Sequence, residues 1–476
     1  MTRAVLLLAV AAALACAAPA AHAAAKVPAP SPTDTLRLSI DDSVARALAT
    51  SAGARAAMAA VKVADGQVRE ATSDALPQVT GAVSYNRKFD SIFRSAADDT
   101  SLGGLADLFS KSSFAAVHGW TADLTASQTL WSGKVGAGIA AARSVRKYAL
   151  ATRDEALADI AVNARAAYLE ALSSAAVQSI AEEGLALSRA HLAQVKLFHA
   201  QGARSEYDLL QAQVDAANQE PAVVAARNAS EQALIRLRQL LNLPAAQPLA
   251  LTTALAFEPG QVPVLAADPG DGSVRAALRG ADAMVSARRQ AVSAEKWARW
   301  PRLAASATVS HQAFPDEAWP VHRNEFVRAI DGSLRLEWPL FQGGRTFGSV
   351  QRATAELRQA EAQRDQVYDD VAFAARQARQ EVDRALATLA ARRGTVQLAA
   401  RAHHLATVRW RNGLSTQLEV SDARLQLQTA EVNEVTAIKD YRLALMRLER
   451  ASGAPLTLAN RSLDDLTSIL PADGER

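Results

Sequence analysis

The chain has 476 residues, of which 49% are hydrophobic but only 5% aromatic, so alanine and leucine make up most of its apolar mass. This composition is typical of long packed helices and argues against a bulky globular core. The formal net charge is only +3, and no run of lysine and arginine forms a basic stripe, so a nucleic acid is not an expected partner.

The N-terminus predicts an exported protein. Arg3 precedes a short apolar run, and Ala21-His22-Ala23 matches the A-x-A cleavage pattern, so residues 1–23 are expected to be a signal peptide. The alternative is cleavage before Cys16, the only cysteine, whose preceding residues loosely resemble a lipobox; Cys16 would then be acylated. No later stretch holds 18 consecutive apolar residues, so no transmembrane helix is expected.

The first half of the chain is predicted to alternate helices with one pair of strands. In order, we expect a helix, two strands, a long helix and a shorter helix, over residues 39–75, 78–86, 120–130, 133–200 and 205–241. Pro77 stops the first helix. The strands alternate polar and apolar side chains with period two and form a hairpin over 78–130. Ser205 and Asp208 have the spacing of a capping box.

The second half repeats this order. A connector at 243–272 is followed by a helix, two strands and two helices, over residues 273–300, 303–310, 330–340, 345–411 and 415–452. Leu130-Trp131 corresponds to Leu340-Phe341 and Pro244 to Pro455, at a nearly constant spacing of about 210 residues. The expected division is therefore a first repeat at 24–242, a second at 273–455 and a C-terminal tail at 456–476, with hairpins of strands at 78–130 and 302–340 and helical hairpins at 133–242 and 345–452.

The predicted lengths point to an elongated molecule. A helix of 68 residues would extend about 100 Å and needs partners along its whole length, as in a coiled coil. Two shorter helices stacked end to end have about the length of one long helix. We therefore expect the connector and both ends of the chain to meet at a belt partway along a helical cylinder.

The strands resemble those of transmembrane β-proteins. Residues 120–130 alternate over the whole strand and are bounded by Trp120 and Trp131. The alternative is an ordinary amphipathic hairpin on a soluble sheet. Four strands cannot close a barrel, and an open edge is not tolerated in lipid, so several chains must contribute. The expected fold class is an α+β membrane protein, a trimeric 12-stranded β-barrel continued by a long α-helical coiled-coil tunnel.

Three motifs together resemble the TolC-like outer-membrane factor family. They are the junction Leu340–Arg345, the turn Asn412–Ala423 and its first-half counterpart Ser205–Gln213. The resemblance implies a homotrimeric exit duct of a tripartite efflux or type I secretion system. It would sit in outer-membrane lipid, reach into the periplasm, and dock onto a periplasmic adaptor protein that is coupled to an inner-membrane transporter. Gln342 departs from the usual Phe-Asp-Gly-Gly junction, and Ala203 stands where a leucine is common.

The resemblance also implies site residues. The adaptor-docking tips would be Gly202, Ala203, Arg204, Gly413, Leu414 and Ser415. A periplasmic gate would use Glu419 and Asp422, with Asp208 as the first-half counterpart, because a ring of acids favours cations and repels anions. The alternative is that these acids only stabilise helix starts, with Asp208 as a cap. Arg204 is expected to pair with an acid and hold the closed state.

Aromatic residues near the strand ends are expected to form lipid-interface belts. The main candidates are Trp120, Trp131, Trp338 and Phe341, with Trp319 and Phe326 as further members. Packing inside a soluble sheet is the alternative. The polar faces of residues 121–129 and 331–337 would line the lumen.

Motifs of enzymes and metal sites are missing from the sequence. It has no H-x-x-x-H pair, no G-x-S-x-G and no phosphate-binding loop, so we expect no catalysis, cofactor or metal. The rival function is structural, a trimeric coiled-coil stalk or adhesin anchored by a barrel. Channel conductance in a lipid bilayer would separate the two.

Overall fold

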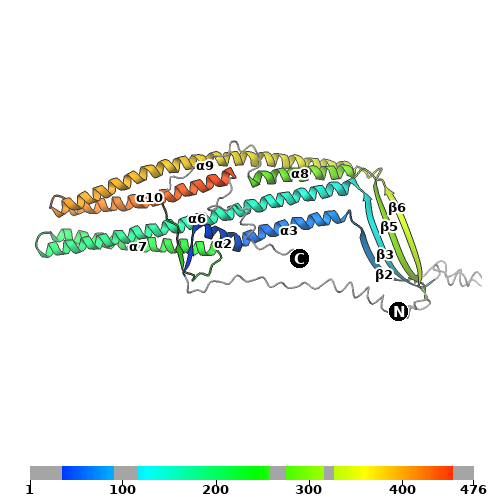
Figure 1. Cartoon of the computed structure of the whole chain (residues 1–476), viewed down its shortest axis with the longest axis horizontal. Coiled ribbons are helices and arrows are strands. Elements are labelled where there is room, and N and C mark those ends of the chain that lie inside the picture. The colour runs from blue at the N-terminus through cyan, green and yellow to red at the C-terminus, as the bar shows by residue number, and fades with distance from the viewer. Residues whose placement is uncertain (1–34, 90–115, 257–274, 316–325, 454–476) are drawn as a thin grey trace, which may run out of the picture.

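A computed structural model of the chain describes residues 35–89, 116–256, 275–315 and 326–453. The molecule is a long rod of helices with one sheet at its end (Figure 1). Its helices are α2 (Ile40–Thr50), α3 (Ala52–Ser73), α6 (Gly133–Ala200), α7 (Glu206–Leu240), α8 (Ala276–Trp297), α9 (Arg345–Arg411) and α10 (Gln417–Ser452). The turns between α6 and α7 and between α9 and α10 lie at the end opposite the sheet. The predicted signal peptide (residues 1–23), with Cys16, and Trp319 fall outside the described residues.

The sheet is antiparallel, in the order β2-β3-β5-β6. Its strands are β2 (Gln78–Arg87), β3 (His118–Trp131), β5 (Arg302–Ala313) and β6 (Val327–Glu337). Residues opposite one another in the register share a face. Thr125 pairs with Thr308, which pairs with Asp331, whereas Leu124 pairs with Val309 and then Ile330. The sheet therefore has a mostly polar face and a mostly apolar face, as the alternation predicted, although Gln128, His311 and Arg328 interrupt the apolar one.

An irregularity at the helix end of β3 turns one tryptophan to the apolar face. Strict alternation would place Trp131 on the polar face with Thr129. The register shifts between Thr129 and Trp131, so that Trp131 lies opposite Leu303 on the apolar face. Its ring meets the ring of Trp297 edge-on, with centroids 6.1 Å apart. The bulge thus directs Trp131 away from the polar face at the point where strand becomes helix.

The long helices pack through buried residues that recur every seven positions. On α6, Ala137, Ser144 and Ala151 are buried at one end and Ala181, Ser188 and Val195 at the other. On α7 and α10 the series are Ala216, Val223, Ser230 and Leu237, and Ala430, Ala437, Ala444 and Ala451. A period of seven keeps one seam facing a partner along a long helix. The mostly small side chains let the helix axes approach closely.

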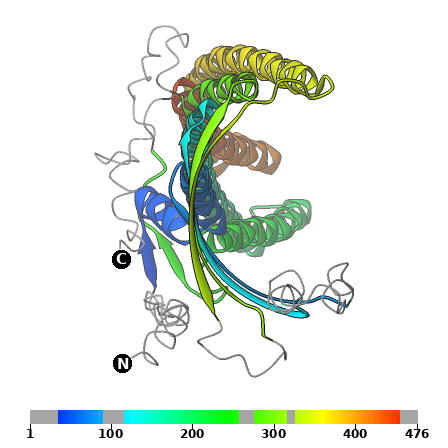
Figure 2. The same cartoon turned by 90° about the vertical axis from the view of Figure 1, so that its right-hand side faces the viewer.

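The shorter helices share the length of the long ones. Along α6, α7 covers one half while α3 and α8 cover the other; along α9, α10 and α8 divide the length in the same way. Viewed from the sheet end, strands and helices follow one curved wall rather than surrounding a closed core (Figure 2). In the described residues, no helix is long and apolar enough to cross a membrane.

A small parallel sheet joins the N-terminal segment to the connector partway along the rod. β1 (Leu36–Leu38) pairs with β4 (Leu249–Leu251), and their side chains join a core with α2, α6 and α7. The buried Tyr168 hydroxyl donates to the Leu38 carbonyl at 2.9 Å and accepts from the Thr253 amide at 3.1 Å. The N-terminal segment and the connector therefore do meet at a belt, although neither short strand was predicted.

The element predictions succeed for the long helices and fail at one break. Helices over 133–200 and 345–411 are confirmed. The single helix over 39–75 is wrong, because the chain breaks at Ser51 between α2 and α3. Ser51 has extended backbone angles, and its hydroxyl accepts a hydrogen bond from the Gly53 amide at 3.1 Å. A side chain that caps the next helix offsets the cost of the interruption.

Two glycines in the first turns of α6 give a matched test of the junction. A Cβ added at Gly133 would lie 2.3 Å from Cδ2 of Trp297, whereas one at Gly136 would meet nothing within 4 Å. Gly133→Ala is expected to destabilise the protein by about 1–3 kcal/mol through overpacking. Gly136→Ala should be neutral or stabilising, because alanine favours helix. Thermal unfolding followed by circular dichroism measures both; equal midpoints would contradict the close packing of Trp297 on Gly133.

Candidate functional site

The two helical turns at the far end of the rod have the same backbone form. Gly202 and Gly413 have φ of +71° and +72°, the left-handed conformation that glycine adopts at least cost. Each glycine amide donates to the carbonyl three residues before it, and the next amide donates to the carbonyl five residues before it, at 2.9–3.0 Å. This is the Schellman ending of a helix. The predicted tip residues therefore do form the turns, while their docking role stays a prediction.

The acids beyond the turns differ in their surroundings. Asp208 accepts hydrogen bonds from the Ser205 amide and hydroxyl, at 3.2 and 2.9 Å, and completes a capping box at the start of α7. Glu419 lies in the first turn of α10, which Thr416 caps, and Asp422 follows one turn later. Both are exposed, and neither has an ion pair among the described residues. Asp208 has a structural task; Glu419 and Asp422 are free to face a passage.

A buried tryptophan joins the two helical hairpins just behind the turns. Trp410 is 1% exposed and packs against His191 and Phe198 of α6, with ring centroids 4.5 and 5.9 Å away. Arg204 donates to the Trp410 carbonyl at 2.9 Å, and its guanidinium lies 4.9 Å from the Trp410 ring centroid. Arg204 thus bridges the hairpins through a tryptophan, not through the expected acid.

An ion pair further from the tip also joins the two hairpins. Arg424 of α10, whose side chain is 6% exposed, donates to Asp215 of α7 at 2.9 Å. Ser421 donates to the same carboxylate oxygen at 2.6 Å. Removing one partner of such a buried pair leaves an uncompensated charge and costs about 3–5 kcal/mol. The pair therefore fixes how α7 and α10 lie against each other.

The imidazole of His191 lies within this cluster, where its surroundings disfavour the charged form. It hydrogen-bonds the side-chain oxygen of Gln417 on α10. Burial lowers the pKa of His191, and the positive charges of Arg424 and Arg204 lower it further, against the opposing effects of Gln417 and Asp215. Burial also lowers the pKa of His403 nearby on α9. Acidification therefore works against the contact between the hairpins.

We call these contacting residues the tip cluster: His191, Phe198, Arg204, Asp215, Trp410, Gln417, Ser421 and Arg424. Sequence reasoning missed this cluster. Its members come from four helices that are distant in sequence, so no local motif marks them. One signal was present: Gln417 and Arg424 are polar residues seven positions apart, the spacing of a buried seam.

The second region of interest is the junction between sheet and helices. Gly343 and Gly344 have φ of +58° and +82°, and Gly344 is the N-cap of α9, so the glycines do allow the sharp turn there. The Trp338 indole donates to the Arg299 carbonyl at 3.2 Å. Trp338 and Phe341 are 60% and 89% exposed. Exposed aromatic rings beside an apolar sheet face are typical of a lipid interface.

The junction has exposed aromatic residues that the sequence did not single out. Besides Trp131, three further exposed aromatic residues lie around the junction: Trp297, Trp300 and Phe347. Trp120 lies at the other end of β3, half-buried against Tyr85 with ring centroids 4.9 Å apart. Trp297 and Trp300 were overlooked because they end a helix rather than a strand. The belt assignment itself stays a prediction.

The two segments of the chain that hold these sites match a known protein family. The model of the outer membrane efflux protein family matches residues 44–243 and 273–454, one segment in each half of the chain. The chain belongs to the outer membrane efflux protein family. It is therefore an outer-membrane exit duct that extends into the periplasm, which confirms the resemblance, the function and the location expected from the sequence.

Solved structures share the fold at low identity. The outer membrane protein VceC from Vibrio cholerae is 22% identical with a TM-score of 0.68, over 87% of this chain and 96% of VceC. The CmeC outer membrane channel from Campylobacter jejuni is 15% identical with a TM-score of 0.73, over 91% and 89%. The open MtrE outer membrane channel from Neisseria gonorrhoeae is 17% identical with a TM-score of 0.70, over 87% and 88%.

Two searches gave negative results. A search of curated protein sequences returned no match. Within the described part of the chain, no group of three or more histidine, cysteine, aspartate or glutamate side chains is placed to hold a metal ion.

The tip cluster is expected to loosen as the pH falls. Because the pKa of His191 is lowered from its ordinary value of about 6.5, its contribution is fully present above that pH and is lost as the pH falls through the lowered value. Hydrogen exchange over residues 191–204 and 410–424, corrected for intrinsic rates, should show less protection at pH 5.5 than at 7.5. His191→Gln should remove most of this difference and His404→Gln should not; equal protection at both pH values would refute the idea.

Proposed function

We propose that three copies of this chain form the outer-membrane duct, with their sheets joined edge to edge into a barrel of twelve strands. One observation carries the proposal: the sheet has a mostly polar and a mostly apolar face, while β2 and β6 form its edges and each has one partner strand among the described residues. An apolar face suits lipid and a polar face suits a water-filled passage, but open edges in lipid would leave backbone groups unpaired. Pairing of β6 with β2 of a neighbouring copy removes both edges.

The helical tips are the proposed docking surface for a periplasmic adaptor that is coupled to an inner-membrane transporter. Gly202, Ala203 and Arg204 form one turn, and Gly413, Leu414 and Ser415 form the other. Leu414 is 69% exposed beside its turn, and Tyr207 is 72% exposed in the first turn of α7. Rigid, similar turns with exposed apolar side chains support repeated docking of a helical partner.

The proposed gate lies just behind these turns. In a trimer, Glu419 and Asp422 would contribute six carboxylates to one ring at the narrow end. Like charges at close range raise the cost of closure and favour cations in the passage. The cluster around Trp410 would set the closed position of α10, because it ties that helix to α7. Asp208 contributes to this gate through the cap of α7.

A coiled-coil stalk or adhesin is the weaker alternative. A stalk needs packed helical seams, and this chain has them. It has no need for a sheet with a polar face, for example Thr125, Thr308 and Asp331, across all four strands. That face supports a passage for water.

Neighbouring residues on β6 test the two faces. Leu334 lies on the apolar face and Ser333 on the polar face, and both are exposed in the single chain. Leu334→Arg is expected to cost about 2–4 kcal/mol if the residue meets lipid near the bilayer midplane. Ser333→Arg should be tolerated. The readout is the amount of heat-resistant protein in the outer-membrane fraction, and equal loss in both variants would argue against a lipid-facing Leu334.

Planar-bilayer recording tests both the duct and its gate. The wild-type protein should conduct, whereas a stalk should not. Glu419→Ala combined with Asp422→Ala should lower the single-channel conductance and reduce the preference for cations, because the variant loses both the charge that attracts cations and the like-charge repulsion that opposes closure. Asp369→Ala with Asp370→Ala, two exposed acids midway along α9, makes the same change in net charge as a control. Unchanged conductance and ion preference in the first variant would rule out a gate at these acids.

A further inference from the structure

A cavity of about 480 Å³ lies at the junction between sheet and helices. The start of α6, the end of α8, the ends of β5 and β6, and the first turns of α9 all contribute to its wall. Its charged lining residues are Lys134, Glu295, Arg302, Glu337, Arg345 and Arg352. None of these residues belongs to the tips or the gate. The cavity is about 100 Å from the tips, since α9 runs the length between them.

Three of the cations in this cavity have no protein partner. Arg302 is neutralised by Glu337, with nitrogen–oxygen distances of 2.6 and 3.0 Å. By contrast, the described residues offer no ion pair or hydrogen-bond partner to the side chains of Lys134, Arg345 and Arg352, which are all exposed. Glu295 is the single lining carboxylate without an ion pair in the same part of the chain. Three free cations against one free carboxylate leave an excess of two positive charges per chain.

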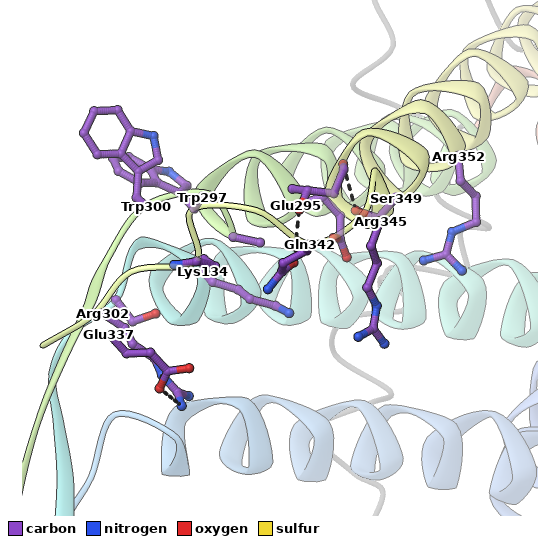
Figure 3. Close-up of a pocket in the computed structure, with 14 residues that line it drawn as sticks. Lys134, Glu295, Trp297, Trp300, Arg302, Glu337, Gln342, Arg345, Ser349 and Arg352 are labelled. Atoms are coloured by element: carbon purple, nitrogen blue, oxygen red, sulfur yellow. Dashed lines mark hydrogen bonds and ion pairs between the residues drawn. The ribbon is translucent and has the colours of Figure 1, made fainter. Parts of the chain in front are cut away.

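The cavity opens on the polar side of the wall. Arg302 and Glu337 pair on the polar face of the sheet, in register with Ser306 and Ser333 further along. Figure 3 shows Arg345 and Arg352 extending to the same side as these two residues. The rings of Trp297 and Trp300 also line the cavity, from the opposite side. The cations therefore face away from the aromatic belt, toward the side assigned to the passage.

We propose that this cavity binds a soluble oxyanion of two or more negative charges, a phosphate group or a pair of carboxylate groups of a solute in the passage. Guanidinium groups match such oxygens with paired N–H donors, and a lysine adds a mobile point charge. The low local density of acids keeps the potential positive. The inference rests on the proposed duct, because the duct makes the polar side the wall of a passage. A lipid headgroup offers the same chemistry, but it would approach from the aromatic side.

Binding is tested on the full-length protein in detergent, with inorganic pyrophosphate as the probe and calorimetry at low salt as the readout. Lys134→Gln, Arg345→Gln and Arg352→Gln together should weaken binding by about tenfold or more. Glu295→Gln should strengthen it by about two- to fivefold, because it removes the one opposing charge. Opposite effects from variants of opposite charge are not expected from loss of folding.

The matched control removes three cations of α9 that lie far from the cavity. Arg392→Gln, Arg401→Gln and Arg411→Gln lie 40 or more residues beyond Arg352, about 60 Å along α9. This variant should bind pyrophosphate like the wild type. Equal weakening in both triple variants would overturn the site, because binding would then depend only on the overall positive charge of the protein. No binding by the wild type would also overturn it.

Planar bilayers separate the site from the duct and the solute from the lipid. In phosphatidylcholine, pyrophosphate should reduce the wild-type current, and the Lys134, Arg345 and Arg352 triple variant should resist it. A wild type that does not conduct contradicts the duct but leaves the calorimetric result standing. A conducting wild type without a pyrophosphate effect contradicts only the site in the passage. Loss of the effect when phosphatidylglycerol is added would overturn the solute assignment in favour of a lipid headgroup.

Discussion

The structure depends on small side chains that recur every seven residues along its helices. Most of the stability of a helix in a protein comes from packing, so the 68-residue α6 needs a buried seam along its length. Alanine and serine at these positions let the partner helices approach closely, and the seven-residue period keeps the seam from drifting round the helix. The scarcity of aromatic residues follows from this, because a bulky ring would force the axes apart. Buried rings include Trp410, Tyr168 and Tyr441, and Trp410 lies where the two hairpins are joined.

The sheet and the helical wall must also be joined at a fixed angle. The sheet has its side chains divided between two faces, whereas the helical wall buries its seams between helices. The bulge before Trp131 and the two left-handed glycines before α9 reconcile these geometries. Gly133 completes the junction by giving Trp297 room to lie flat over the start of α6. A change of backbone direction is therefore obtained with very few special residues.

Much of the fold could be predicted from the sequence, because the side-chain pattern of its strands and helices is periodic. Alternation in residues 120–130 and the absence of breakers after Arg345 were sufficient for strands and long helices. The failures are local or long-range. Ser51 breaks the helix predicted over 39–75 because its hydroxyl caps the next helix. The helix predicted over 205–241, by contrast, is continuous although Pro221 lies inside it. Propensity cannot decide either case, since packing on α6 outweighs one lost hydrogen bond.

The charged sites were predicted unevenly for a related reason. Acids near a turn, such as Glu419, are visible because a motif surrounds them, but Asp208 shows that the same motif also produces ordinary caps. The pair Asp215–Arg424 is formed by side chains 209 positions apart, and only folding brings them together. The cations of the junction are hidden similarly, because they come from the starts of two different helices.

The two ends of the tunnel have charges of opposite sign, acids at the tips and cations at the junction. They lie about 100 Å apart along α9, whereas a charge in physiological salt is screened within about 8–10 Å. Neither end can therefore influence the ions at the other through its field. In the proposed duct a solute would meet the two in sequence; the gate would control conductance, and the junction would only retain or release what passes. This separation allows the selectivity of the gate and the affinity of the junction to change independently, since no residue belongs to both.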